Sequence, residues 1–347
     1  MKNLYLKIFV IIIAPVLFIT ETEAAKKKIY LEKCSPEEKG LNFVKITNEV
    51  DGISGADASA ASSELNYAII TKGYCKKTNF TWFCPTNLTI SPDGKRLAYL
   101  THSNNQDNVL VSSVQPQGMP VKRISRTIFG GLFWGSDNQL YFGDNNNPNF
   151  YVSSIDADAG SLMTQHTKGE MEVSYPVLSS DGNMLFFTRW EEDRGPSIWV
   201  YNKKEDKISS CTRGYNACPI PDTNDAFYCV RNNADGKSEI WYVNYVKGQE
   251  TLILSDINCS FTNPALSPDG KWLLLVGNAV SSISKQQNLD IFAVRTDGTN
   301  LTQLTFHPEH DCCPVWSKDG RSIYFISSRE DANQNYNVWR MNFVLDF

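Results

Sequence analysis

The chain has 347 residues and a formal net charge of −5, from 33 basic and 38 acidic side chains. A mildly negative net charge gives no indication of binding to nucleic acid or to an anionic membrane surface. The length would allow two average domains, but no linker-like composition follows residue 50. We therefore expect one large domain over residues 41–347.

Residues 1–24 have the features of a secretory signal peptide. Lys2 and Lys7 give a basic start, residues 8–19 are apolar, and the small residues Ala24 and Ala25 offer a cleavage site. The apolar run is too short to span a bilayer comfortably, which disfavours the alternative of an uncleaved anchor. We predict residence in the periplasm or secretion, no membrane insertion after signal removal, and an N-terminal lead over residues 25–40.

Three short segments before the first clear repeat have strand-like patterns. Residues 41–47 and 65–71 are extended apolar runs, and residues 79–83 form another. Only 30 residues separate Ser63 from Asp93, which is too few for four strands. We interpret residues 53–84 as a trimmed blade or an accessory hairpin.

Four short polar turns then recur along the chain. Their aspartates lie 88, 88 and 50 residues apart, and such a fixed interval indicates a repeat architecture. Asp can bond nearby backbone and Gly accepts the exit geometry of the turn, so these residues are expected to be structural. The turns are Ser91-Pro92-Asp93-Gly94, Ser179-Ser180-Asp181-Gly182, Ser267-Pro268-Asp269-Gly270 and Ser317-Lys318-Asp319-Gly320.

The repeating unit is about 44 residues long, because worn copies of the turn lie midway, near Asp137 and Asp222. Each unit places an apolar second strand after the turn and an aromatic or β-branched third strand after a polar loop, which predicts all-β structure. The second strands are residues 97–100, 140–142, 185–187, 227–230, 273–276 and 323–326. The third strands are residues 109–114, 150–155, 198–201, 240–245, 291–294 and 338–343.

The pattern Pro-x-x-Ser-Pro-Asp-Gly-Lys, followed by these strands, resembles the WD40-like PD40 repeat of TolB-type β-propellers. The best copy covers residues 264–305, and the resemblance covers residues 41–347. It implies a propeller of four-stranded blades, periplasmic residence and a cell-envelope partner. It does not imply an activity, because such propellers serve many functions.

The last repeat stops directly after its third strand. Residues 41–47 align with residues 299–305, a fourth strand, and keep its Asn, two apolar positions and Thr. We predict that this N-terminal strand completes the last blade and removes an open sheet edge, rather than forming a plain edge strand. Six blades are predicted, with residues 53–84 as the candidate for a trimmed seventh.

Nine cysteines in an exported chain are expected to be partly paired, and the odd number leaves one over. Cys75 with Cys84 and Cys211 with Cys218 are the local candidate disulfides. Cys312 or Cys313 could instead reach Cys259 or Cys229. No Cys-x-x-Cys pair is present to indicate zinc.

A TolB-type propeller has two distinct faces. We call the side that carries the turns between first and second strands the turn face. The loops between second and third strands, and those between blades, form the opposite loop face. Function is expected on the loop face, where Arg and aromatic side chains suit protein, peptide or saccharide recognition without catalysis or a cofactor. The binding-face candidates are His102, Arg189, Trp190, Arg231, Arg329, Glu330, His307 and His310.

The alternative is a metal-dependent lyase acting on acidic oligosaccharides. Its divalent ion would be held by His307, His310 and either His166 or His102, with Glu309 or Glu330 as the base. A serine hydrolase is disfavoured, because the chain has no Gly-x-Ser-x-Gly motif.

Overall fold

The computed structural model describes residues 38, 40–48, 87–103, 106–116, 120–125, 129–144, 151–167, 172–191, 194–278, 288–329 and 336–345. The chain divides into two compact units, Met1–Lys39 and Gly40–Phe347. The second unit contains every described strand, and no α-helix occurs among the described residues. No helix in this part of the chain is long and apolar enough to cross a membrane.

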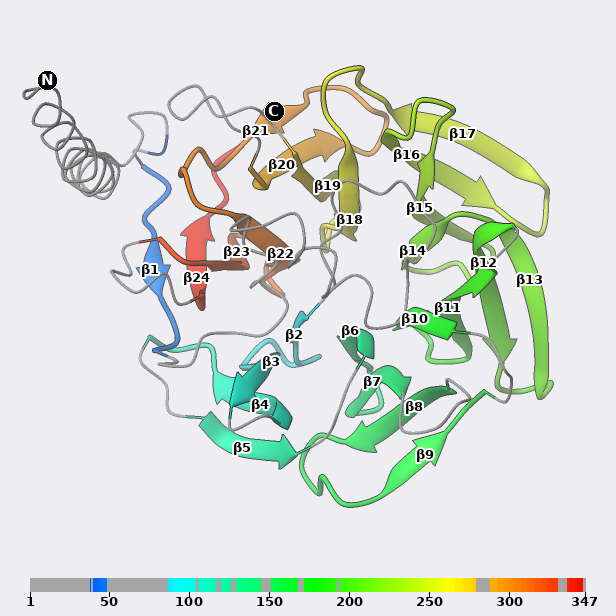
Figure 1. Ribbon diagram of the computed structural model, residues 1–347, viewed down its shortest axis with the longest axis horizontal. Helices are drawn as coiled ribbons and strands as arrows, with labels where there is room; N and C mark the ends of the chain where they lie inside the picture. Colours follow the sequence, from blue (N-terminus) through cyan, green and yellow to red (C-terminus); the bar gives the residue numbers. More distant parts are fainter. Residues whose placement is uncertain are drawn as a thin grey trace, which may run out of the picture. The chain divides into compact units, whose positions relative to one another are not determined.

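The unit from Gly40 consists of six four-stranded antiparallel sheets arranged as the blades of a propeller around a central axis (Figure 1). Blade 1 contains β2 (Leu88–Ile90), β3 (Arg96–Ser103), β4 (Gln106–Ser113) and β5 (Pro120–Ser125). Blade 2 contains β6 (Phe129–Trp134), β7 (Gln139–Asp144), β8 (Tyr151–Asp156) and β9 (Met163–Gln165). Blade 3 contains β10 (Glu172–Leu178), β11 (Met184–Glu191), β12 (Gly195–Asn202) and β13 (Lys207–Arg213).

The remaining three blades follow the same order from the axis outward. Blade 4 contains β14 (Tyr215–Pro219), β15 (Ala226–Asn232), β16 (Ser238–Asn244) and β17 (Gln249–Leu254). Blade 5 contains β18 (Phe261–Leu266), β19 (Trp272–Gly277), β20 (Asp290–Arg295) and β21 (Thr302–Gln303). Blade 6 contains β22 (Asp311–Trp316), β23 (Ser322–Ser327), β24 (Asn337–Asn342) and the N-terminal strand β1 (Val44–Lys45). The predicted second and third strands are confirmed in every blade.

The ring closes through β1, as predicted. Val44 lies opposite Arg340 of β24, and Lys45 lies opposite Trp339. The innermost strand of blade 6, β22, packs against β2 of blade 1, so the six blades form a ring without a further one between them. The candidate seventh blade over residues 53–84 lies outside the described residues, as does the predicted signal peptide.

Residues 41–47 and residues 299–305, which align in sequence, also make equivalent hydrogen bonds. Thr47 Oγ1 accepts the backbone N–H of Val338 at 2.9 Å, and Thr305 Oγ1 accepts that of Ile291 at the same distance. Thr167 Oγ1 has the same role toward Val152 in blade 2. In three blades, a threonine after the outermost strand therefore forms a hydrogen bond to the beginning of the third strand.

The Ser-x-Asp-Gly turns are held by a repeated set of hydrogen bonds. In blade 5, Ser267 Oγ donates to Asp269 Oδ1 at 2.6 Å and accepts the N–H of Trp272 at 2.9 Å. Gly270 has a φ of 72°, a conformation that suits glycine. These bonds hold the pKa of the Asp269 carboxyl below its usual range, chiefly through the Ser267 hydroxyl. These contacts are those of a turn that holds its own backbone, in keeping with the predicted structural role.

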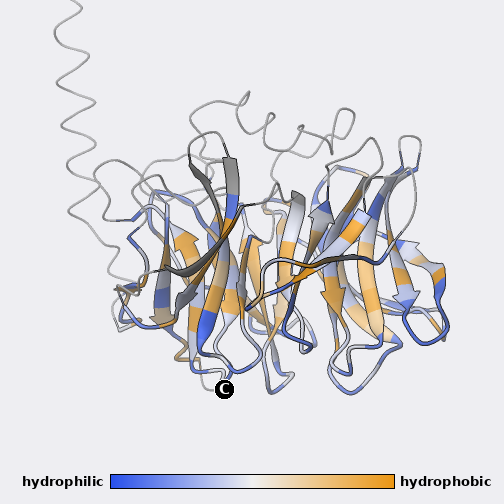
Figure 2. Ribbon diagram, turned by 90° about the horizontal axis from the view of Figure 1, so that it is seen from below, coloured by the Kyte–Doolittle hydropathy of each residue, from blue (hydrophilic) through white to orange (hydrophobic). Residues whose placement is uncertain are grey.

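The hydrophobic core lies between neighbouring blades. Trp272 and Leu274 of blade 5 pack with Trp316 and Phe325 of blade 6, and equivalent clusters join the other blades. Hydrophobic residues accordingly run along the strands, and hydrophilic residues concentrate in the connecting turns (Figure 2). Both faces of each sheet are covered, which explains the continuous apolar runs in the sequence.

The predicted disulfide between Cys211 and Cys218 is wrong, because both are free thiols. Cys211 lies on β13 at the outer edge of blade 3, whereas Cys218 lies on β14 at the inner edge of blade 4. The chain crosses from rim to axis between them, so their Cβ atoms cannot approach as a disulfide requires. Cys75 and Cys84 lie outside the described residues.

Candidate functional site: the central cavity

A cavity with a volume of about 380 Å³ lies where the innermost strands of all six blades meet. Its wall is built mainly from the C-terminal halves of these strands. It also includes Ser180, Pro221 and Pro268, which belong to the turns that follow three of the strands. The cavity therefore lies toward the turn face, whereas the sequence had directed attention to the loop face.

The local sequence of the innermost strands shapes this wall. In blades 3, 5 and 6 a residue with positive φ interrupts the strand register and a proline follows it, as in Asn263-Pro264. A proline cannot donate to a ladder, so it is tolerated at an innermost strand, whose axial side pairs with no further strand of its sheet. Six prolines line the cavity: Pro176, Pro219, Pro221, Pro264, Pro268 and Pro314.

Among the described residues, the lining includes no Asp, Glu, Lys, Arg or His. Its titratable side chains are Tyr175, Cys218 and Cys313. Burial raises the pKa of the Cys218 thiol to about 11, so this sulfur stays neutral at physiological pH. The wall is thus apolar and uncharged.

Two buried carboxamides stand out in this wall. Asn216 of β14 is 5% exposed and Asn263 of β18 is 4% exposed. Asn216 Nδ2 and both side-chain polar atoms of Asn263 have no hydrogen-bond partner among the described residues. Leaving a buried polar group unpaired costs about 1–3 kcal/mol, so such groups call for an explanation.

Hydrogen bonds between neighbouring innermost strands hold the wall in place. The backbone N–H of Trp134 donates to Thr89 Oγ1 at 3.0 Å, which joins blades 2 and 1. The N–H of Leu266 donates to Cys218 Sγ at 3.3 Å, which joins blades 5 and 4. The wall is therefore built mainly on strands that are hydrogen-bonded to one another across blades.

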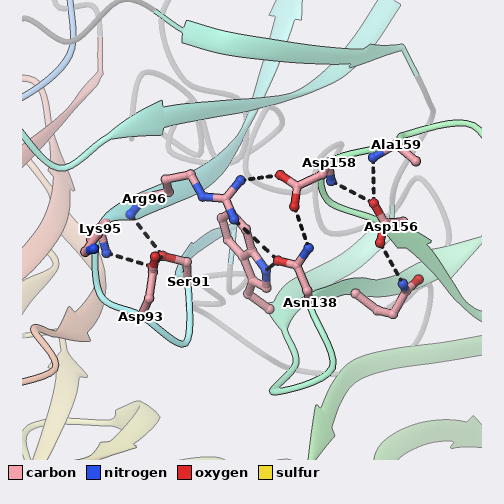
Figure 3. A network of polar contacts seen from close by, with 10 residues as sticks. Ser91, Asp93, Lys95, Arg96, Asn138, Asp156, Asp158 and Ala159 are labelled. Atoms are coloured by element: carbon pink, nitrogen blue, oxygen red, sulfur yellow. Dashed lines mark hydrogen bonds and ion pairs between the residues drawn. The ribbon is translucent and has the colours of Figure 1, made fainter.

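The turn face around the cavity also carries polar links between blades. Arg96 of β3 forms an ion pair with Asp158 at 2.5 Å and stacks on Trp134, 4.9 Å from its ring centroid (Figure 3). Asn138 donates to Asp158 Oδ2 at 2.8 Å and accepts from the indole of Trp134 at 3.2 Å. These contacts fix blade 1 against blade 2.

The arginine and tryptophan candidates of the loop face are engaged within the protein. Arg329 is 3% exposed; it pairs with Asp311 at 2.6 Å and lies over the ring of Phe43. Trp190 is buried and donates to Ser174 Oγ at 2.7 Å. Neither side chain offers its anchoring group to a partner in this arrangement.

The other two arginine candidates are also engaged, Arg231 between blades 4 and 3 and Arg189 within blade 3. Arg231 binds both carboxylate oxygens of Glu250, at 2.8 and 2.7 Å, and also donates to Thr212 of blade 3. Arg189 stacks on Trp199, 4.2 Å from its ring centroid. The side chains of His102 and Glu330 lie outside the described residues.

The three histidines whose side chains are described are at least partly buried and bonded within the protein. His310 Nδ1 accepts the backbone N–H of Leu289 at 2.9 Å, and His307 Nδ1 accepts that of Glu309 at 3.1 Å. Burial lowers the pKa of both imidazoles to about 4. His166 lies 2.8 Å from Ser154 Oγ, and burial lowers its pKa to about 4 as well.

Among the described histidines of the metal alternative, His166 does not come together with His307 and His310. His307 and His310 lie between blades 5 and 6, whereas His166 follows β9 in blade 2, on the opposite side of the ring. The described residues contain no group of three or more His, Cys, Asp or Glu side chains placed to hold a metal ion.

Sequence reasoning missed the cavity residues, although a signal for them exists. The turn is preceded by Pro-x-x in three blades, and the residue before that proline is Tyr175, Asn263 or Cys313. That residue is the one with positive φ at the cavity wall. The motif that identified the repeat therefore extends into the candidate site.

No family model matches the chain. TolB from Acinetobacter baumannii superposes with a TM-score of 0.54 and 16% identity over 72% of this chain, which spans 64% of that protein. A protein assigned as TolB from Agrobacterium tumefaciens gives a TM-score of 0.54 and 15% identity, and the match covers 75% of this chain and 90% of that protein. Hydrazine synthase from Kuenenia stuttgartiensis gives a TM-score of 0.50 and 15% identity, and the match covers 73% of this chain and 77% of that protein. These likenesses concern the fold alone, and by that measure the chain folds as a six-bladed, TolB-like β-propeller.

Proposed function

We propose that the chain is an exported, non-enzymatic binding module whose partner, an envelope protein or peptide, docks at the turn-face mouth of the central cavity. One observation carries the proposal: all six blades converge on an uncharged cavity of about 380 Å³. Pockets of roughly 300–1,000 Å³ with a mainly apolar wall are typical of ligand sites. The described loop-face candidates are engaged internally, which favours the turn face over the sequence-based choice.

The chemistry of the wall favours binding over catalysis. A general acid or base must titrate near the working pH. The Cys218 thiol is held neutral by burial, with a pKa of about 11. A saccharide partner is a less favoured ligand, because the wall offers few polar side chains for its hydroxyl groups.

A photocrosslinking experiment tests the docking position. Ser180 is exposed at the mouth of the cavity, whereas Lys207 is exposed on the outermost strand β13. Benzoylphenylalanine placed at Ser180 should yield a discrete adduct with an envelope component, and the same group at Lys207 should not. Adducts of equal yield from both positions, or none from Ser180, would count against the proposal.

Export is supported by the composition of residues 1–24. We expect the protein from a periplasmic extract to begin at residue 25 or 26. A mature chain that still begins at Met1 in the cytoplasm would refute export.

A further inference from the structure

The lining of the uncharged cavity indicates which ligand chemistry would fit it. We infer that it takes an uncharged peptide segment, which inserts an apolar side chain from the turn face and bonds through its backbone amides to Asn216 and Asn263. This inference rests on the proposed function and names the chemistry of its ligand.

The charge of the ligand follows from the wall. No acidic or basic side chain lines the cavity among the described residues, and six of the lining residues are prolines. A charged group that entered would lose its hydration without gaining a counter-ion, which is strongly unfavourable. An apolar side chain, by contrast, gains from contact with the proline and leucine surface.

The backbone of the wall favours a peptide over other neutral ligands. Each innermost strand is the edge of its sheet, so backbone groups on its axial side take no part in a ladder. The prolines remove N–H donors from this edge and leave carbonyl acceptors. A peptide supplies repeated N–H donors, which is how extended segments are recognised at sheet edges.

The two asparagines supply the complementary donors and acceptors. Each occupies a position with positive φ, 53° at Asn216 and 55° at Asn263. Blade 2 meets the same backbone requirement with Gly130 and Gly131, and blade 6 meets it with Cys313. The backbone therefore does not demand asparagine, and the unpaired amides of blades 4 and 5 are explained by a bound amide group.

Titration of the purified protein with two capped peptides tests the inference. The uncharged probe is N-acetyl-Ala-Ala-Leu-Ala-Ala-amide, and the control replaces its central Leu by Glu. The Leu peptide should bind at least about tenfold more tightly, because the carboxylate would be buried without a partner. Equal affinity for the two peptides, or no binding of the Leu peptide, would overturn the inference.

A double variant, Asn216→Gly with Asn263→Gly, tests the role of the amides. Glycine keeps the positive φ and removes the carboxamides, so affinity for the Leu peptide should fall about tenfold or more. The melting temperature of the peptide-free protein should change little, because Asn216 Nδ2 and both side-chain polar atoms of Asn263 have no partner among the described residues. A lower melting temperature with unchanged affinity would assign the amides a structural role and contradict the inference.

Two further comparisons separate the possible outcomes. N-acetyl-leucinamide should bind more weakly than the pentapeptide; equal binding would show a small-molecule site and overturn the peptide assignment. The crosslinking result at Ser180 does not depend on ligand charge. An adduct there without discrimination between the two peptides would therefore reject this inference alone and leave the proposed function intact.

Discussion

At the scale of single residues, hydrogen-bonding side chains define the repeat more sharply than the hydrophobic pattern does. The turn aspartates accept bonds from a serine hydroxyl and from the backbone two residues on, as Asp181 does from Ser179 and Asn183. These bonds lower the pKa of the Asp181 carboxyl. Their contribution to stability is therefore complete at neutral pH and is lost only in strong acid.

The buried histidines impose a different pH dependence. Burial lowers the pKa of His307 and His310 from 6.5 to about 4, with Asp311 opposing the shift at both and Arg329 reinforcing it at His307. The unfolded chain takes up protons below pH 6.5 while the folded chain resists them. The free energy of unfolding should therefore be largest above pH 6.5 and decrease as the pH falls toward 4.

A substitution isolates one of these histidines. His310→Gln keeps an acceptor for the Leu289 N–H and removes the titrating group. The slope of the free energy of unfolding against pH, measured by urea denaturation near pH 5, should decrease by the equivalent of about one proton. An unchanged slope would mean that His310 is protonated in the folded protein.

At the scale of elements, closure by β1 depends on the same threonine contact that ordinary blades use. Thr47 Oγ1 donates to Asn337 Oδ1 at 2.9 Å and accepts the N–H of Val338 at 2.9 Å. Thr47→Val keeps the shape of the side chain and removes both bonds. We expect the free energy of unfolding to fall by about 1–3 kcal/mol.

Thr305→Val is the matched control, because Thr305 makes the equivalent bond within blade 5. Both variants should lose similar stability, but only Thr47→Val should speed hydrogen exchange in β24. Equal exchange of β24 in the two variants would show that β1 does not limit the opening of blade 6.

The strands were predictable from sequence, whereas the site was not, for a physical reason. Each blade buries both of its faces, so apolar runs such as residues 273–276 identify strands directly. The cavity is lined by strand edges, and an edge becomes a wall only when six sheets close into a ring. The burial of Trp190 beside Tyr215 of blade 4, and of Arg329 against Phe43 from the N-terminal segment, likewise depends on contacts that local sequence does not reveal.

At the scale of the whole molecule, the candidate binding site lies toward the turn face, whereas the sequence predicted it on the loop face. The charged and aromatic candidates of the described loop face contact other residues within a blade, as Arg329 does with Asp311, or between blades, as Arg231 does with Thr212. The turn face, which carries the structural turns, also leads to the uncharged cavity. We therefore expect a partner to bind in this cavity, which it reaches from the turn face.

Hydrogen–deuterium exchange of the protein with and without the capped Leu peptide locates the bound peptide. We expect slower exchange in the turn-face halves of the innermost strands, such as residues 216–219 and 263–266, with little change in the outermost strands. Protection confined to the loop face at saturating peptide would contradict this expectation.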